Sequence, residues 1–334
     1  MRYRRYITNR YKRYIYPAII NEYFKQDRFD EFFQTKGHEI DYAGKHEDSL
    51  KFSTDRDSFK CLTRVFNIAL PAKAAPDKNY SLFKARFLEA AYGNGHEANE
   101  ITQLNSSALA ALMFFYNVSD SNPLILSFTI KGKKIRLKFT SVILEKENPV
   151  FAANYPSSID IALYGNNEDS GNPAVLFLES KLGEYLTVRN CSAGKSYKNI
   201  YELIEAQKTK MGVLQEITFK TGDICHILGP EHYCEGLKQM VSHFIGAKNS
   251  YELNVEGREI YLGSILFDFN GIEYAQTKLD SYRKVYEGLA KVLNDIDDNR
   301  RINLIDSILT YRQVFFKNKD FKCDKEVIAL YFGE

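Results

Sequence analysis

Two apolar segments joined by a dense run of turn-forming residues constrain the fold of this chain more than any other feature. Residues 159–163 alternate aliphatic side chains with Asp160, and residues 174–178 are apolar throughout. Residues 165–173 between them consist mainly of Gly, Asn, Asp, Ser and Pro, a composition typical of a turn. We therefore predict two neighbouring antiparallel strands, with Asp160 on the face opposite its aliphatic neighbours.

The second segment ends in Glu179-Ser180-Lys181, which adds charged groups at the end of the predicted hairpin. Glu179 and Lys181 are two residues apart on a strand, so they share a face. The two carboxylates suit Mg²⁺, which prefers oxygen ligands and can activate a bound water. The lysine ammonium group can stabilise negative charge that develops during the reaction. The pattern predicts metal-assisted hydrolysis. A surface hairpin whose Glu and Lys are merely solvated is the alternative interpretation.

The segment Pro156-Ser157-Ser158-Ile159-Asp160 together with Glu179-Ser180-Lys181 resembles the signature of the PD-(D/E)xK nuclease superfamily. The resemblance is strongest to a branch of bacterial restriction endonucleases, covers about residues 85–270, and includes segments around residues 93–110 and 233–243. It implies that Asp160, Glu179 and the Ser180 carbonyl bind Mg²⁺ or Mn²⁺ and that Lys181 activates water. In the superfamily's pattern proline directly precedes the aspartate, whereas here three residues separate Pro156 from Asp160.

The resemblance also implies accessory residues on the helices before and after the hairpin. Glu97 matches the glutamate that often completes the metal site, with Glu100 and Glu89 as competitors at helical spacing. Gln239 is the preferred polar residue on the later helix, and Lys238 is the alternative; both would steady water or phosphate. His243, one turn after Gln239 on the same helix, could approach the site, but we expect a packed or capping histidine.

Charge is distributed unevenly along the chain, although the formal net charge is only +2. Residues 1–16 hold six basic and five tyrosine residues and no acid, a composition that can grip phosphates and stack on bases. We predict nucleic-acid contacts by Arg4, Arg5, Arg10, Arg13, Lys195, Lys198 and Lys238. A solvated helix or loop is the alternative at each place.

The remaining composition is that of an ordinary soluble protein, with 44% hydrophobic and 26% charged residues. No stretch reaches the ~20 apolar residues needed to span a bilayer, and no signal peptide is recognised. Five scattered cysteines argue against a disulfide framework. We expect a cytoplasmic protein that does not enter membranes.

We predict an α/β fold: a restriction-endonuclease-like central mixed β-sheet flanked by helices, with helical additions at both ends. Residues 1–80 would form a helical, basic segment, residues 81–270 the nuclease-like core, and residues 271–334 helices packed on it. The expected helices are 82–92, 106–116, 201–215, 233–246, 273–296 and 302–316; the expected strands are 124–130, 134–144, the Asp160 and Glu179 segments, and 260–269.

The functional prediction is a Mg²⁺-dependent DNA endonuclease, used in restriction or defence, that acts on double-stranded DNA. The resemblance also allows a homodimer and a cognate methyltransferase as partners. Two alternatives stay open: a catalytically silent nucleic-acid-binding protein on the same fold, and a repair or structure-specific nuclease.

Overall fold

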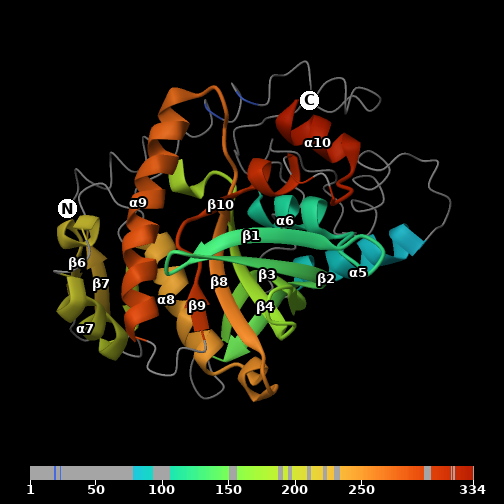
Figure 1. Cartoon of the computed structure of the whole chain (residues 1–334). Helices are drawn as coiled ribbons and strands as arrows, with labels where there is room; N and C mark the ends of the chain where they lie inside the picture. The colour runs from blue at the N-terminus through green and yellow to red at the C-terminus, as the bar shows by residue number, and fades with distance from the viewer. Residues whose placement is uncertain are drawn as a thin grey trace.

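A curled, mixed β-sheet forms the centre of the computed structural model (Figure 1), and its strand order is β1-β2-β3-β4-β8-β10, with β9 also paired to β8. The first four strands form an antiparallel meander: β1 (Leu124–Ile130), β2 (Lys133–Pro149), β3 (Pro156–Asn167) and β4 (Pro173–Lys181). The other three run parallel to β4: β8 (Glu259–Leu266), β9 (Ile302–Leu304) and β10 (Leu309–Thr310). An α/β class with a mixed sheet, as predicted, is confirmed.

The structure describes residues 19, 23, 78–92, 106–149, 156–186, 191–194, 198–208, 212–220, 224–228, 234–296, 302–316, 318 and 320–333. The predicted helical, basic segment at residues 1–80 lies almost wholly outside this part of the chain. Within it, no helix combines the length and the apolar character needed to cross a bilayer.

Local backbone chemistry explains the turn between β1 and β2. Lys131 and Gly132 adopt left-handed φ angles of 48° and 76°, as a tight two-residue hairpin requires. The carboxylate of Asp306 accepts hydrogen bonds from both of their N–H groups, at 2.7 and 2.8 Å. The neighbouring Asp306 N–H donates to the Thr129 carbonyl, so the chain after β9 is attached to β1.

An irregularity in β2 changes how its second half faces β3. The register shifts between Phe139 and Ser141, so one extra residue, Thr140, enters β2 there. Gly165 lies opposite Phe139, and a Cβ on it would come within 1.9 Å of the Lys138 carbonyl oxygen. Only a residue without a side chain allows the two backbones to approach this closely.

Helices cover both faces of the sheet, as Figure 1 shows. On β4, the Ser180 hydroxyl donates to the Ser107 carbonyl of α6 (Ser107–Phe115), whereas Glu179 contacts α8 (Cys234–Lys248). Because adjacent strand residues point to opposite faces, α6 and α8 lie on opposite sides of the sheet. The helix α5 (Lys78–Tyr92) packs beside α6 and β2, and α9 (Glu273–Ile296) packs beside α8.

Burial explains why β4 occupies the middle of the sheet. Every residue from Ala174 to Lys181 is buried, which fits a strand covered on both faces. The chain leaves β4, returns through α8 and enters β8 parallel to β4. The charged end of β4 is therefore held inside the protein between two helical layers.

Two predicted helices differ from the structure, and one small sheet is additional to the prediction. Residues 302–316, expected to be a helix, form β9, β10 and a π-helical turn at Arg312–Phe316, followed by α10 (Lys325–Phe332). The helix expected at 201–215 is α7 (Lys198–Gln207) followed by a 3-10 segment at Gly212–Glu216. A second sheet of β5 (Cys191–Gly194), β7 (Ile224–Leu228) and β6 (Thr218–Lys220) was not predicted.

The C-terminal part of the chain also joins the central sheet rather than only covering it. β9 and β10 both pair with β8, so the prediction that residues 271–334 would supply helices alone is wrong. These strands form because their partner is the parallel edge of β8, a long-range contact that local spacing does not reveal.

Candidate functional site

The carboxylates of Asp160 and Glu179 lie just beyond the last paired residues of β3 and β4. Pairing of these strands ends at Ile161 and Leu178, so the next residue on each strand is one of the two acids. The Oδ2 atom of Asp160 accepts a 2.6 Å hydrogen bond from the Ser180 N–H. Asp160 is partly exposed, between the fully buried Ile159 and Ile161, which confirms the predicted alternation.

Glu179 is the centre of a buried network of charged and polar groups. Its Oε1 lies 2.5 Å from the Lys181 ammonium, and its Oε2 accepts a 2.5 Å hydrogen bond from His243 Nε2. His243 Nδ1 is in turn 2.6 Å from the Ser157 hydroxyl. His243 is packed, as expected, and it also contacts Glu179 directly, the approach that its position one turn after Gln239 allowed.

The residue types Ser157, His243 and Glu179 also occur in nucleophilic triads, but their burial argues against that use. Their exposed fractions are 4%, 4% and 2%, so a substrate carbonyl has no access to the serine hydroxyl. Gly246, one helical turn after the histidine, allows α8 to approach this position, because a Cβ there would lie 3.1 Å from that of Ser157. The network therefore fixes the Glu179 carboxylate in place.

The ionisation states follow from these contacts. Burial would raise the pKa of Glu179, but the nearby Lys181 and His243 outweigh it and lower this pKa to about 2. Burial would lower the pKa of Lys181, but Glu179 above all raises it over its ordinary value. Both groups are thus charged at neutral pH.

Asp160 has the opposite tendency. Burial, and then the negative charges of Glu179 and Glu145, raise its pKa well above the ordinary value, and Lys181 and the Ser180 N–H offset only part of this effect. The ionised form of Asp160 is therefore short of compensating positive charge. A cation placed beside this carboxylate would supply it.

Glu145 belongs to the site although the sequence did not indicate it. Leu144 pairs with Ile161 and Lys146 with Ile159, which places Glu145 opposite Asp160. Its φ angle of 51° is left-handed, it is 8% exposed, and its Oε2 accepts a 2.8 Å hydrogen bond from the Ser158 hydroxyl. Left-handed conformations are uncommon for non-glycine residues and cluster at functional sites.

Ser180 has its side chain on the opposite face of β4, in the core. Its hydroxyl lies 2.7 Å from the Tyr311 hydroxyl and donates to the Ser107 carbonyl at 3.2 Å. Ser180 is fully buried. Its side chain thus ties β4 to α6 and to the segment after β10, while its backbone N–H holds Asp160.

Gln239 is one helical turn before His243 on α8, and so lies on the same side of the helix. Its Oε1 is buried and has no hydrogen-bond partner among the described residues. Tyr282 of α9 adjoins the network: burial raises its pKa to about 12, while the Lys181 charge lowers it. Gln239 therefore lies on the side of α8 from which His243 contacts Glu179.

The other predicted residues are placed differently. Glu97, Glu100, Arg4, Arg5, Arg10, Arg13 and Lys195 lie outside the described residues. Glu89 on α5 forms an ion pair with Arg86 and accepts a 3.3 Å hydrogen bond from the Leu144 N–H, next to Glu145. Lys238 is partly exposed on α8, and Lys198 forms an exposed ion pair with Glu202 at 3.8 Å.

The oxygen donors of the site fit a divalent cation only in part. No three His, Cys, Asp or Glu side chains in the described ranges are grouped closely enough to hold a metal ion. Mg²⁺ commonly takes only one or two protein carboxylates and completes its shell with water and phosphate oxygens. Asp160 fits that requirement, whereas Glu179 would have to exchange one of its present partners for the metal.

Comparison with models of known protein families, with characterised proteins and with solved structures gave no match to this chain. What the protein does is therefore inferred from the chemistry of Asp160, Glu179, Lys181 and their neighbours.

Proposed function

We propose that this protein is a Mg²⁺- or Mn²⁺-dependent DNA endonuclease of the PD-(D/E)xK superfamily with a restriction-endonuclease-like core. One observation carries the proposal: Asp160 and the Glu179–Lys181 ion pair lie together where β3 and β4 stop pairing, and Asp160 is bonded there to the Ser180 N–H. A mixed sheet covered by helices on both faces supports it. We favour a role in restriction or defence, in which the enzyme would cut double-stranded DNA in the cytoplasm.

The side chains would divide the work as follows. Asp160 and Glu179, with the Ser180 carbonyl and Glu97, would hold the cation, which when bound polarises the scissile phosphate and acidifies its water. Lys181 would orient the attacking water and stabilise charge that develops on the phosphate oxygens. The Gln239 Oε1, which has no described partner, can accept a hydrogen bond from that water or from a water beside it.

The decisive experiment is cleavage of plasmid and linear duplex DNA with Mg²⁺, with Mn²⁺ and with EDTA. We expect Asp160→Asn and Lys181→Ala to lower the cleavage rate by about 100-fold or more, because each removes a group that stabilises the transition state. Asp280→Asn and Lys278→Ala on α9 are charge-matched controls and should cut like the wild type. Equal cutting by all five proteins would dismiss this site.

The contacts of Glu179 favour a second candidate function. Both of its oxygens are engaged, by Lys181 and His243, as they would be in a catalytically silent nucleic-acid-binding protein on the same fold. That protein would bind DNA with unchanged affinity in every metal and would cut none. A branched DNA substrate in the same assay tests the third alternative. A repair or structure-specific nuclease would cut the branched DNA in preference to plain duplex, unlike the restriction enzyme and the silent binding protein.

A further inference from the structure

The outer face of the β1–β2 hairpin carries a row of exposed basic side chains. Lys134, Arg136 and Lys138 alternate along β2 and are exposed, whereas Leu137 and Phe139 between and after them are buried. Alternate strand residues share a face, so the three cations lie in a row. We call this row, with the opposing Thr129 and Ser127, the basic hairpin face.

The two lysines of this face are not committed to ion pairs within the described residues, whereas Arg136 is. Arg136 contacts Glu168, and Asp169 and Asp320 are close enough to influence it. Among the residues that the structure describes, no acid forms a salt bridge with Lys134 or Lys138. Two exposed cations without neutralising partners, about 13 Å apart along the strand at ~3.3 Å per residue, are suited to a partner with repeated negative charges.

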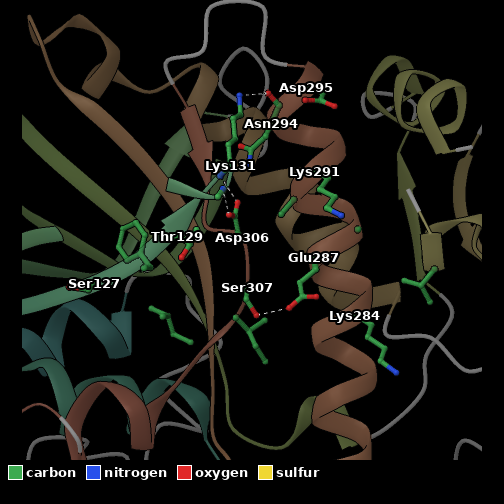
Figure 2. Close-up of a pocket in the computed structure, with 17 residues that line it drawn as sticks. Ser127, Thr129, Lys131, Lys284, Glu287, Lys291, Asn294, Asp295, Asp306 and Ser307 are labelled. Carbon is green, nitrogen blue, oxygen red and sulfur yellow. Dashed lines mark hydrogen bonds between the residues drawn. The ribbon is translucent and has the colours of Figure 1, made fainter. Parts of the chain in front are cut away.

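A cavity of about 1000 Å³ adjoins Ser127 and Thr129 of this face. Figure 2 shows the residues that line it. Ser127 and Thr129 line one side of it, and α9 lines the other with Lys284 and Lys291, both exposed. Two of the three acids in the cavity wall accept hydrogen bonds: Glu287 from the Ser307 hydroxyl, and Asp306 from the hairpin N–H groups. The third, Asp295, is exposed on α9. The hydroxyls at the cavity edge add hydrogen-bond donors of a kind that contact phosphates.

We propose that the basic hairpin face binds the phosphate backbone of a nucleic acid, as an anchoring surface separate from the carboxylate site. The choice of a nucleic acid as the polyanion rests on the proposed nuclease function. Lys134 is eleven residues from Glu145 along β2, at most about 36 Å at ~3.3 Å per residue. Because duplex DNA rises 3.4 Å per base pair, a substrate needs no more than about ten base pairs to reach both places.

Binding of the full chain to a labelled 30-base-pair duplex in EDTA, over a range of salt concentrations, tests the surface without cleavage. Each phosphate contact contributes about −0.9 to the slope of log K against log salt. Lys134→Ala/Lys138→Ala should therefore flatten the slope by about 1.8 and weaken binding on the order of 50-fold at 0.1 M salt. The charge-matched double variant Lys278→Ala/Lys325→Ala should match the wild type.

The outcomes separate this proposal from the nuclease proposal. If both double variants bind like the wild type, the anchoring surface is wrong even where Mg²⁺-dependent cleavage is found. If the hairpin lysines control binding but no metal supports cleavage, the surface stands and the nuclease proposal fails. Binding of the wild type to phosphatidylglycerol vesicles but not to the duplex would overturn the choice of nucleic acid.

Discussion

At the scale of single residues, the site contains two carboxylates with opposite electrostatic surroundings. Glu179 is paired with Lys181 and His243, which hold it ionised. Asp160 accepts one backbone hydrogen bond, which favours its charged form. Burial and its two acidic neighbours outweigh this bond and disfavour the charge. In many active sites, two acids in different environments have different pKa values and take different roles in the reaction.

Asp160→Asn should stabilise the folded protein at neutral pH. Because the pKa of Asp160 is raised in the folded protein, its protonated form stabilises the fold. This stabilisation is fully present below the unfolded-state pKa of ~3.9 and is lost as the pH rises through the folded-state pKa. The asparagine keeps an oxygen for the Ser180 N–H and removes the charge. We expect a gain of about 0.5–2 kcal/mol at pH 7, and none at pH 4.

Urea unfolding of the two proteins at pH 4, 5.5 and 7 measures this difference. A constant difference at all three values would show that the Asp160 charge is not its source. Adding Mg²⁺ at pH 7 should narrow the gap, because only the wild type has the carboxylate that the ion would stabilise.

At the scale of elements, the strands that local patterns define were predicted well. β1 has the predicted bounds because its burial alternates and a left-handed turn follows it. Glu145 was missed because Thr140 shifts the register of β2, and counting along a sequence cannot reveal such a bulge. Tertiary contacts also decide β9: the Asn294 side chain bonds both the N–H and the carbonyl of Leu304, a pairing invisible in the helical spacing of residues 302–316.

Gly165→Ala should disrupt the β2–β3 pairing that positions Glu145 and Asp160. The added Cβ would meet backbone atoms of Lys138 and Phe139 at 1.9–2.7 Å, and backbone cannot move aside as a side chain can. We expect a loss of about 3 kcal/mol or more, at or above the upper end of ordinary overpacking. Gly246→Ala, which meets side-chain atoms at 3.1–3.2 Å, should cost about 1 kcal/mol.

Urea unfolding of both glycine variants gives the comparison. Equal losses would mean that β2 and β3 are farther apart at Gly165 than described here. Because the register on either side of the bulge sets which residue faces Asp160, the Gly165 variant should also lose metal-dependent cleavage.

At the scale of the whole molecule, residues distant in the sequence share one core. Tyr23 is 8% exposed and packs edge-on against Phe267 and Phe269, with ring centroids 5.5 and 5.2 Å away. Its hydroxyl lies 3.4 Å from the Arg312 guanidinium. These contacts join the beginning of the chain to the segment after β8, an arrangement that the predicted basic N-terminal segment did not include.

Tyr23→Ala should therefore destabilise the whole protein, although Tyr23 is far from the site in the sequence. Loss of a buried aromatic ring costs about 3–5 kcal/mol. Tyr23→Phe keeps both ring contacts and should cost about 0.5–1.5 kcal/mol for the lost hydrogen bond. Thermal and urea unfolding distinguish the two, and equal stability of both variants would show that the ring does not pack as described.

The hydrogen bond from the Asp306 N–H to the Thr129 carbonyl has a consequence for behaviour at high concentration. β1 ends the sheet on one side, and exposed outer strands can recruit other chains into continuous intermolecular sheets. The chain after β9 occupies one of the open positions of this strand, and the Asn318 amide occupies another at the Ile125 carbonyl. These two contacts thereby protect the edge strand β1 from pairing with another copy of the protein.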